Sequence, residues 1–378
     1  MKFRHLMMAA CAAAMTTGAG YAEGLKVGMI TTLSGGGAGL GIDVRDGFML
    51  AVKQSGADME VVIEDDQRKP DIAVQLADKM VQQEKVDVLT GIIWSNLAMA
   101  VVPAVTAQGK FYLSPNAGPS ALAGKGCHKN YFNVSWQNDA FSEAAGAWAS
   151  ENGIGKVFLM APNYPAGKDM MAGFKRYFKG EVSDEVYTKL GQSDYAAEIA
   201  QIKASDADMA YYFLPGGMGI SFMKQYAGSG ADKAVMGPAF SFDQGILGAI
   251  GEAALGVKNT SHWGKDIDNA ANKAFVESFQ AEYGRLPSLY ASQGFDTAAL
   301  LISAMGKADV KDADAFRAAL EAADFASTRG DFSFGPNHHP VQTIYMREVV
   351  KEGDVVTNKI IGTASAGHTD TYAGDCKM

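Results

Sequence analysis

The chain has 378 residues, enough for two domains or for one large α/β unit. It carries 33 Lys and Arg residues against 42 Asp and Glu residues, a net charge of −9, with no basic stripe along it. Such a chain repels phosphate backbones and anionic membrane surfaces, so nucleic acid is excluded as a partner.

The first 22 residues predict a cleaved signal peptide. Lys2 and Arg4 precede an apolar run, and the small residues around Tyr21 place the cut before Glu23. The run is shorter than the roughly 20 residues of a membrane span, and a lipoprotein signal ending at Cys11 is the minor alternative. Cleavage leaves 31 basic residues against 42 acidic ones, a net charge of −11.

Short β-rich runs then alternate with helical patterns. Strands are expected at residues 25–33, 59–64, 86–93 and 110–114, with helices at 44–54, from 70 onward and at 97–108. The rhythm restarts with strands at 156–161, 207–213 and 234–236 and helices at 167–178, 195–203 and 219–226. Strand–helix alternation of this kind predicts two α/β lobes, each a doubly wound parallel sheet.

The C-terminal third predicts helices and a late return of the chain. Helices at 269–283, 289–305 and 314–322 have too few strands between them for a third sheet, so we expect them to cover the first sheet. Strands at 342–350 and 355–361 are expected to return to the second lobe. Because ligands bind beyond the carboxyl ends of parallel strands, two facing lobes predict a cleft that closes on a solute by a hinge motion.

After cleavage the chain keeps two cysteines, Cys127 and Cys376. An even count in an oxidising compartment favours a disulfide that ties the C-terminal tail back to the chain, with two unpaired thiols as the alternative. Neither cysteine has a C-x-x-C partner, so a zinc or redox motif is not supported.

Polar residues at strand ends are the candidate ligand site. The glycine loop at 35–41 matches neither nucleotide-binding motif, but its position before a helix permits ligand contacts. Ser95 lies where a strand meets a helix and can either cap that helix or bind an anion. Residues 116–118 end the next strand, so the two strand ends together suggest a cradle for a carboxylate.

Catalytic and metal-binding patterns are lacking in the sequence. There is no nucleophile elbow, no H-E-x-x-H and no His/Cys cluster with metal spacing, so neither an enzyme nor a cofactor or metal is expected. His338 and His339 are expected to be solvated in a loop. Asp65 and Asp66 are interpreted as loop or surface charges.

An ordered set of motifs resembles the branched-chain amino-acid binding protein family, the type I periplasmic receptors of ABC transporters. Besides the opening strand and glycine loop, the set comprises GIIWS at 91–95, LSPNAGP at 113–119, NYPAG at 163–167, MGP at 236–238 and YASQGFD at 290–296. The resemblance covers essentially the whole chain after the signal. It implies the two-lobed fold with three crossings between lobes, a periplasmic location, a membrane permease as partner and a monomer.

The resemblance also implies roles for particular residues. The ligand carboxylate would meet Ser95 and the 116–118 loop, and Tyr164 would close from the second lobe. Where family members that bind amino acids usually carry an acid for the ligand ammonium, this chain has Ala239 followed by Phe240. A buried ammonium without a carboxylate would remain unpaired at a cost of several kcal/mol.

This departure predicts an aromatic or otherwise amine-free carboxylate, such as a benzoate or cinnamate, as the ligand. The predicted ligand-binding residues are Leu40, Trp94, Ser95, Asn116, Ala117, Gly118, Trp136, Tyr164, Ala239, Phe240 and Gln293. An amino acid remains open if Asp139 or Asp243 pairs with the ammonium. A sensor that serves a signalling partner and a secreted hydrolase are the alternatives of other classes.

The crossings are expected near 136–139, 262–265 and 345–347. On that interpretation, residues 24–136 and 265–344 form lobe one, and residues 137–264 and 345–378 form lobe two.

Overall fold

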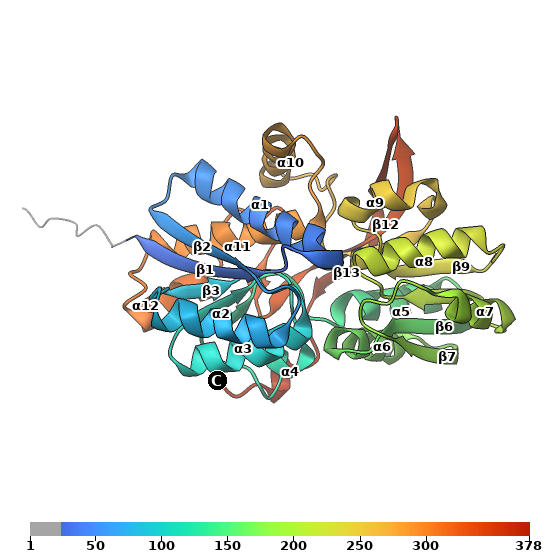
Figure 1. Cartoon of the computed structure of the whole chain (residues 1–378), viewed down its shortest axis with the longest axis horizontal. Helices are drawn as coiled ribbons and strands as arrows, with labels where there is room; N and C mark the ends of the chain where they lie inside the picture. The colour runs from blue at the N-terminus through green and yellow to red at the C-terminus, as the bar shows by residue number, and fades with distance from the viewer. Residues whose placement is uncertain (1–23) are drawn as a thin grey trace, which may run out of the picture.

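The computed structural model describes residues 24–378, so the predicted signal peptide lies outside the described part. Two sheets, each covered by helices, lie side by side along the long axis of the molecule (Figure 1). The predicted fold class, two α/β lobes with parallel sheets, is confirmed. Among residues 24–378, none of the helices has the length and apolar character that crossing a membrane requires.

The first lobe contains a five-stranded sheet in the order β2-β1-β3-β4-β5, with all neighbouring strands parallel. Its strands are β1 (Leu25–Thr31), β2 (Met59–Asp65), β3 (Val88–Thr90), β4 (Phe111–Ser114) and β5 (Tyr131–Asn133). The helices that accompany it in the chain are α1 (Ala38–Ser55), α2 (Pro70–Gln82), α3 (Ser95–Ala107), α4 (Ser120–Ala123), α11 (Leu289–Met305) and α12 (Ala313–Glu321).

Helix α11 packs directly on α1, although about 250 residues separate them in the chain. A Cβ atom on Gly47 would lie 1.9 Å from the carbonyl oxygen of Ala291, and one on Gly294 would lie 2.0 Å from that of Val44. Glycine at both positions therefore allows the two backbones to touch. The expectation that the late helices cover the first sheet is confirmed for α11 and α12, which pack against each other.

The second lobe contains an eight-stranded sheet in the order β11-β12-β10-β9-β8-β6-β7, with β13 paired to β12. Its parallel strands are β6 (Lys156–Pro162), β7 (Glu181–Thr188), β8 (Met209–Tyr212), β9 (Ala234–Pro238) and β10 (Lys258–Ser261). Its helices are α5 (Ala140–Glu151), α6 (Pro165–Tyr177), α7 (Ala196–Ala204), α8 (Gly217–Gly228) and α9 (Gln244–Ile250), while α10 (Ala270–Tyr283) follows the second crossing.

The predicted late strands do return to this sheet. They form the long antiparallel hairpin β12 (Pro340–Glu352) and β13 (Val355–His368), whose tip projects at the upper right of Figure 1. The short strand β11 (Ser333–Phe334) pairs with the start of β12. Strand β7 was not predicted from the sequence, because its residues are mostly polar. This polar character fits its position at the edge of the sheet.

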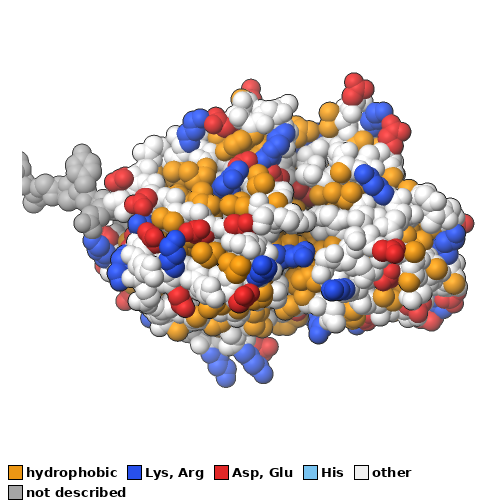
Figure 2. Space-filling model, in the orientation of Figure 1, with side chains coloured by type: hydrophobic (Ala, Val, Ile, Leu, Met, Phe, Trp, Pro, Cys, Tyr) orange, Lys and Arg blue, Asp and Glu red, His pale blue; other side chains and the backbone are white. Residues whose placement is uncertain are grey.

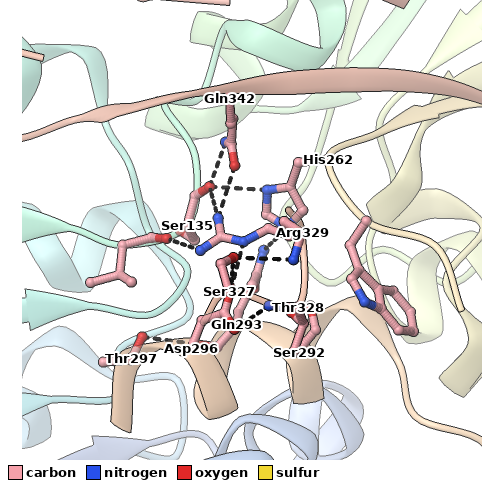
Figure 3. A network of polar contacts seen from close by, with 12 residues as sticks. Ser135, His262, Ser292, Gln293, Asp296, Thr297, Ser327, Thr328, Arg329 and Gln342 are labelled. Carbon is pink, nitrogen blue, oxygen red and sulfur yellow. Dashed lines mark hydrogen bonds and ion pairs between the residues drawn. The ribbon is translucent and has the colours of Figure 1, made fainter. Parts of the chain in front are cut away.

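A buried network of polar groups joins the three segments that cross between the lobes (Figure 3). Arg329 donates from Nη1 to the carbonyl oxygen of Ser135 at 2.9 Å, in the first crossing, and to Oε1 of Gln342 at 2.9 Å, in β12. Its Nε pairs with Oδ2 of Asp296 on α11 at 2.9 Å, and both side chains are almost fully buried. The second crossing joins through His262, whose Nδ1 lies 3.0 Å from the same Ser135 carbonyl oxygen. One guanidinium therefore organises the whole junction.

Two predictions about polar residues were wrong. His338 and His339 are buried, with exposed fractions of 6% and 1%, and the ring of His338 stacks on Phe132 at a centroid distance of 4.1 Å. Asp66 is fully buried and its Oδ1 accepts a hydrogen bond from the Thr32 hydroxyl at 2.6 Å. In each case the tertiary structure covers a segment that reads as a polar loop in the sequence.

The predicted disulfide between Cys127 and Cys376 is present, with a Cα–Cα distance of 5.6 Å. It holds the tail beneath the half of the molecule that contains β1, where Figure 1 marks the C-terminus. Within the tail, four residues before Cys376, the hydroxyl of Tyr372 donates a hydrogen bond to Oδ2 of Asp139 at 2.8 Å and accepts one from Arg176 on α6 at 3.0 Å. The tail therefore contacts both lobes.

We expect the double substitution Cys127→Ser/Cys376→Ser to lower the free energy of unfolding by about 2–4 kcal/mol, because the bridge restricts the unfolded chain over a separation of 249 residues. Urea unfolding without reductant measures the loss. Reductant should lower the midpoint of the wild type and leave that of the variant unchanged. Equal midpoints for the two oxidised proteins would contradict this role.

The substitution Arg329→Met should destabilise the fold by about 3–5 kcal/mol, because it leaves the buried carboxylate of Asp296 without its partner. Thermal and urea unfolding test this. Adding Asp296→Leu should recover part of the loss, because the second charge is then removed as well. Lys53→Met, which breaks the exposed pair with Glu282, is the control and should cost less than about 1 kcal/mol.

Candidate functional site

A narrow cavity lies between the two lobes, at the carboxyl ends of their strands. It is lined by Leu40, Ile93, Trp94, Ser95, Asn116, Trp136, Tyr164, Ala166, Phe213, Pro215, Phe240 and Tyr290. The space between these side chains is about 270 Å³, but only about 10 Å³ of it admits the centre of a water molecule. The side chains of the two lobes therefore close in on one another and leave only a narrow slot between them.

The strand ends of both sheets position these residues, as the ligand-site rule for parallel sheets requires. In the first lobe, Trp94 and Ser95 follow β3, Asn116 follows β4 and Trp136 follows β5. Tyr164 follows β6, Phe213 and Pro215 follow β8, and Phe240 follows β9 in the second lobe. Helices α1 and α11 of the first lobe add Leu40 and Tyr290.

Aromatic rings from both lobes make most of the wall. Trp94 and Tyr164 face each other across the cavity with ring centroids 6.2 Å apart, and Tyr164 stacks on Phe213 at 6.2 Å. Trp136 and Phe240 lie 4.3 Å apart, and Phe240 also contacts Tyr290 at 5.7 Å. Rings at these separations form a stacked and tilted cluster in which another aromatic ring is a favourable guest.

Ser95 is the first residue of α3, whose N-cap position is Trp94, and the Ser95 hydroxyl bonds to Asn138 instead of capping the helix. Asn138 donates from Nδ2 to the Ser95 hydroxyl at 3.1 Å, and its Oδ1 accepts from the backbone N–H of Gly118 at 3.3 Å. The amide oxygen of Asn138 thus lies beside two groups predicted to hold a ligand carboxylate. Asn138 also donates to Oδ2 of Asp169 at 2.8 Å.

Asn116 is the first member of a chain of hydrogen bonds that leads away from the cavity. Its Nδ2 donates to Oε1 of Gln293 at 2.8 Å, and Nε2 of Gln293 lies 3.3 Å from Nε2 of His262. Burial, together with the nearby Arg329, lowers the pKa of His262 well below its usual value, so the ring is neutral. Because Nδ1 faces the Ser135 carbonyl, it carries the proton, and Nε2 accepts from Gln293. This fixes the orientation of both amides.

Seven of the eleven predicted site residues line the cavity: Leu40, Trp94, Ser95, Asn116, Trp136, Tyr164 and Phe240. The other four lie behind the wall. Gln293 orients Asn116, Gly118 binds Asn138, and Ala117 and Ala239 are buried in the surrounding backbone. A Cβ on Gly118 would lie 2.0 Å from the carbonyl oxygen of Trp136, so only glycine fits there.

Five of the lining residues, and Asn138 beside them, were not predicted from the sequence. Ile93 and Tyr290 lie within motifs quoted for the family, so both could have been found by extending those motifs. Phe213 and Pro215 end a strand that was correctly predicted, and a rule that tests every strand end would have found them. For Asn138, the only hint in the sequence was its position at the first predicted crossing between the lobes, near residues 136–139.

Among the described residues, the indole N–H of Trp136 is enclosed without a hydrogen-bond partner, and the hydroxyls of Tyr164 and Tyr290 have none either. Burial raises the pKa of both tyrosines well above the usual value, so each keeps its proton and can donate. The Trp136 nitrogen is fully enclosed. A ligand oxygen could satisfy these donors, since an unpaired buried donor costs about 1–3 kcal/mol.

Neither acid considered as an ammonium partner reaches the cavity. Asp139 already accepts from Ser120, Gln137, Arg176 and Tyr372. Asp243 caps α9 and accepts from the backbone N–H of Leu289 at 2.9 Å. None of the twelve lining residues is charged.

Charged groups lie instead in an outer cleft, in which about 680 Å³ admits the centre of a water molecule against about 10 Å³ in the cavity; Leu40 lines both. There Asp43 pairs with Arg285 at 2.8 Å, and burial raises the pKa of Asp43 to about 7 against the opposing effect of that guanidinium. Over residues 24–378, the structure contains no cluster of three or more His, Cys, Asp or Glu side chains that could hold a metal ion.

Comparisons with known proteins agree with this architecture. Residues 24–354 match the periplasmic binding protein family. A Leu/Ile/Val-binding protein homolog from Brucella melitensis is 30% identical over 361 residues, covering 90% of this chain and 91% of that protein.

Two solved structures extend the comparison. A solute-binding protein of an ABC transporter from R. palustris, in complex with benzoate, has a TM-score of 0.89 and 34% identity over 94% of this chain and all of that one. A branched-chain amino acid transporter substrate-binding protein from Streptococcus pneumoniae, in complex with isoleucine, has a TM-score of 0.79 and 25% identity over 90% of this chain and 99% of that one. These relatives are solute-binding proteins and not enzymes. With its two facing α/β lobes and the closed cavity between them, the chain belongs to the periplasmic binding protein family, as a substrate-binding component of an ABC transporter.

Proposed function

We propose that this protein captures an aromatic carboxylate, such as a benzoate or cinnamate, in the cavity between its lobes. The observation that carries the proposal is the wall itself, which is built of aromatic rings and contains no charged side chain. An amino acid would bring an ammonium group into this wall without a carboxylate to pair with, at a cost of several kcal/mol. The benzoate bound to the R. palustris relative supports the same ligand class.

The ligand carboxylate is assigned to the polar edge of the cavity. Ser95 and Asn116 line that edge, and a shift of Asn138 frees the Ser95 hydroxyl and the N–H of Gly118 in the 116–118 loop to bind the carboxylate. The ring lies against Trp94 and Tyr164, which move apart to admit it, and Trp136 and Phe240 close its far side. A hydroxyl substituent on the ligand ring could accept a hydrogen bond from the hydroxyl of Tyr164 or Tyr290.

The two lobes are proposed to move as bodies, residues 24–136 with 265–344 against residues 137–264 with 345–378. Closure buries the ligand, and the closed form is what a membrane permease recognises. We further propose that residues 1–22 direct export to the periplasm and that the protein acts there as a monomer.

Thermal-shift and calorimetric titrations with benzoate, 4-hydroxybenzoate, cinnamate and leucine test the ligand class. Aromatic acids should raise the melting temperature by mass action, and leucine should not. Ser95→Ala should weaken benzoate binding by about tenfold or more, equivalent to about 1.4 kcal/mol. Ser278→Ala on α10 is the control, because that half-buried hydroxyl donates to the Phe275 carbonyl oxygen and does not line the cavity. Stabilisation by leucine alone would overturn the proposal in favour of an amino-acid receptor.

Two substitutions at Ala239, behind the cavity wall, distinguish the effect of a negative charge from the effect of side-chain volume. Ala239→Asp should weaken benzoate binding more than Ala239→Asn, because the two side chains are nearly equal in volume and only the first repels a carboxylate. Calorimetry at pH 7.5 measures both affinities, and circular dichroism verifies that both variants fold. Equal losses for the two variants would show that the position affects packing only.

A further inference from the structure

Arg68 lies over the outer side of the Trp94 wall, at the junction of the lobes. Its guanidinium carbon is 5.6 Å from the centroid of the Trp94 ring. A Cβ placed on Gly191 of the second lobe would lie only 2.8 Å from Nη2 of Arg68, so the guanidinium rests directly against that backbone. Arg68 therefore touches a cavity-lining ring of one lobe and the facing loop of the other.

The loop that carries Arg68 is held in an unusual conformation. Gln67 and Arg68 both have left-handed backbone angles, with φ of 51° and 58°, which side chains other than glycine rarely adopt. Two carboxylates brace the loop: Oδ1 of Asp65 accepts from the N–H of Gln67 at 2.9 Å, and Oδ1 of Asp66 accepts from the N–H of Arg68 at 2.7 Å. Strain that the surroundings maintain in this way is typical of functional positions.

The carboxylate of Asp66 and the cavity-lining ring of Trp94 belong to one hydrogen-bond network. Oδ1 of Asp66 also accepts from the hydroxyl of Thr32 at 2.6 Å, and Thr32 in turn accepts from the indole N–H of Trp94 at 2.9 Å. Asp66 thus fixes both the backbone of Arg68 and, through Thr32, the ring on which the guanidinium lies. The position of this cation relative to the cavity is therefore set by the fold.

The guanidinium of Arg68 has no acidic partner. Within residues 24–378, no carboxylate lies within 4.0 Å of it, and it donates no hydrogen bond. This differs from Arg176, Arg285 and Arg329, each of which pairs with a carboxylate. On the face drawn in Figure 2, Lys and Arg side chains lie on both sides of the junction between the lobes. A cation held without a partner at the junction can attract an approaching anion.

We propose that Arg68 is a positioning residue that steers the ligand carboxylate into the cleft; this rests on the proposed capture of an aromatic acid. The chain as a whole is acidic, with a net charge of −9, and repels such a ligand at long range. A local cation at the mouth offsets that repulsion and raises the rate of association. Arg68 acts on the encounter, and Ser95 and the 116–118 loop act on the bound state.

Stopped-flow measurement of tryptophan fluorescence with benzoate tests this, since Trp94 and Trp136 line the cavity. At low salt, Arg68→Gln should lower the association rate constant by about three- to tenfold and leave the dissociation rate constant nearly unchanged. Lys69→Gln removes the same charge from the neighbouring exposed residue and should have a much smaller effect. Arg68→Lys should restore most of the rate.

The ionic strength provides the second readout. In about 0.5 M NaCl the difference between wild type and Arg68→Gln should largely disappear, because salt screens the attraction between this half-exposed charge and a distant ligand over a few ångströms. A salt-independent loss, or equal losses for Arg68→Gln and Lys69→Gln, would overturn the steering role while leaving the ligand class intact. A wild-type protein that does not bind benzoate or another aromatic acid would instead overturn the proposed function, and the steering role with it.

Discussion

The buried guanidinium of Arg329 holds together the chain segments that lead into the crossings between the lobes. Three separate chain segments cross between the lobes, and each has backbone groups that must find partners away from water. Arg329 reaches the first crossing at Ser135 and the third at Gln342, and Asp296 balances its charge. His262 brings the second crossing to the same carbonyl oxygen. A neutral side chain could not serve so many acceptors at once.

The ligand cavity continues that junction. The chain of amides from His262 through Gln293 to Asn116 carries the orientation of the crossing into the wall of the slot. A movement of His262 would therefore change the orientation of the Asn116 side chain through Gln293. On the opposite wall, the rings of Tyr164, Phe213 and Phe240 belong to the second lobe, so both lobes contribute walls to the slot.

Periodicity and motif order were sufficient to predict both parallel sheets, the late hairpin, the disulfide and seven of the cavity-lining residues. They failed where tertiary contacts override local character. His338 and His339 read as a polar loop but are enclosed beneath Phe132, and Asp66 is buried as the brace of a strained turn. Asn138 was missed because its role arises only when Ser95, Gly118 and Asp169 meet around it. Such convergence of distant segments has no signature in a single sequence.

The bond between Cys127 and Cys376 has a consequence for the order in which the chain folds. Helix α11 lies on α1, so the first lobe cannot complete its core until nearly the whole chain has emerged. The bridge joins residues 249 positions apart, and its second cysteine is the third residue from the C-terminus. The bridge therefore cannot close before residue 376 has been synthesised, and until then Cys127 lacks the partner that it has in the folded chain.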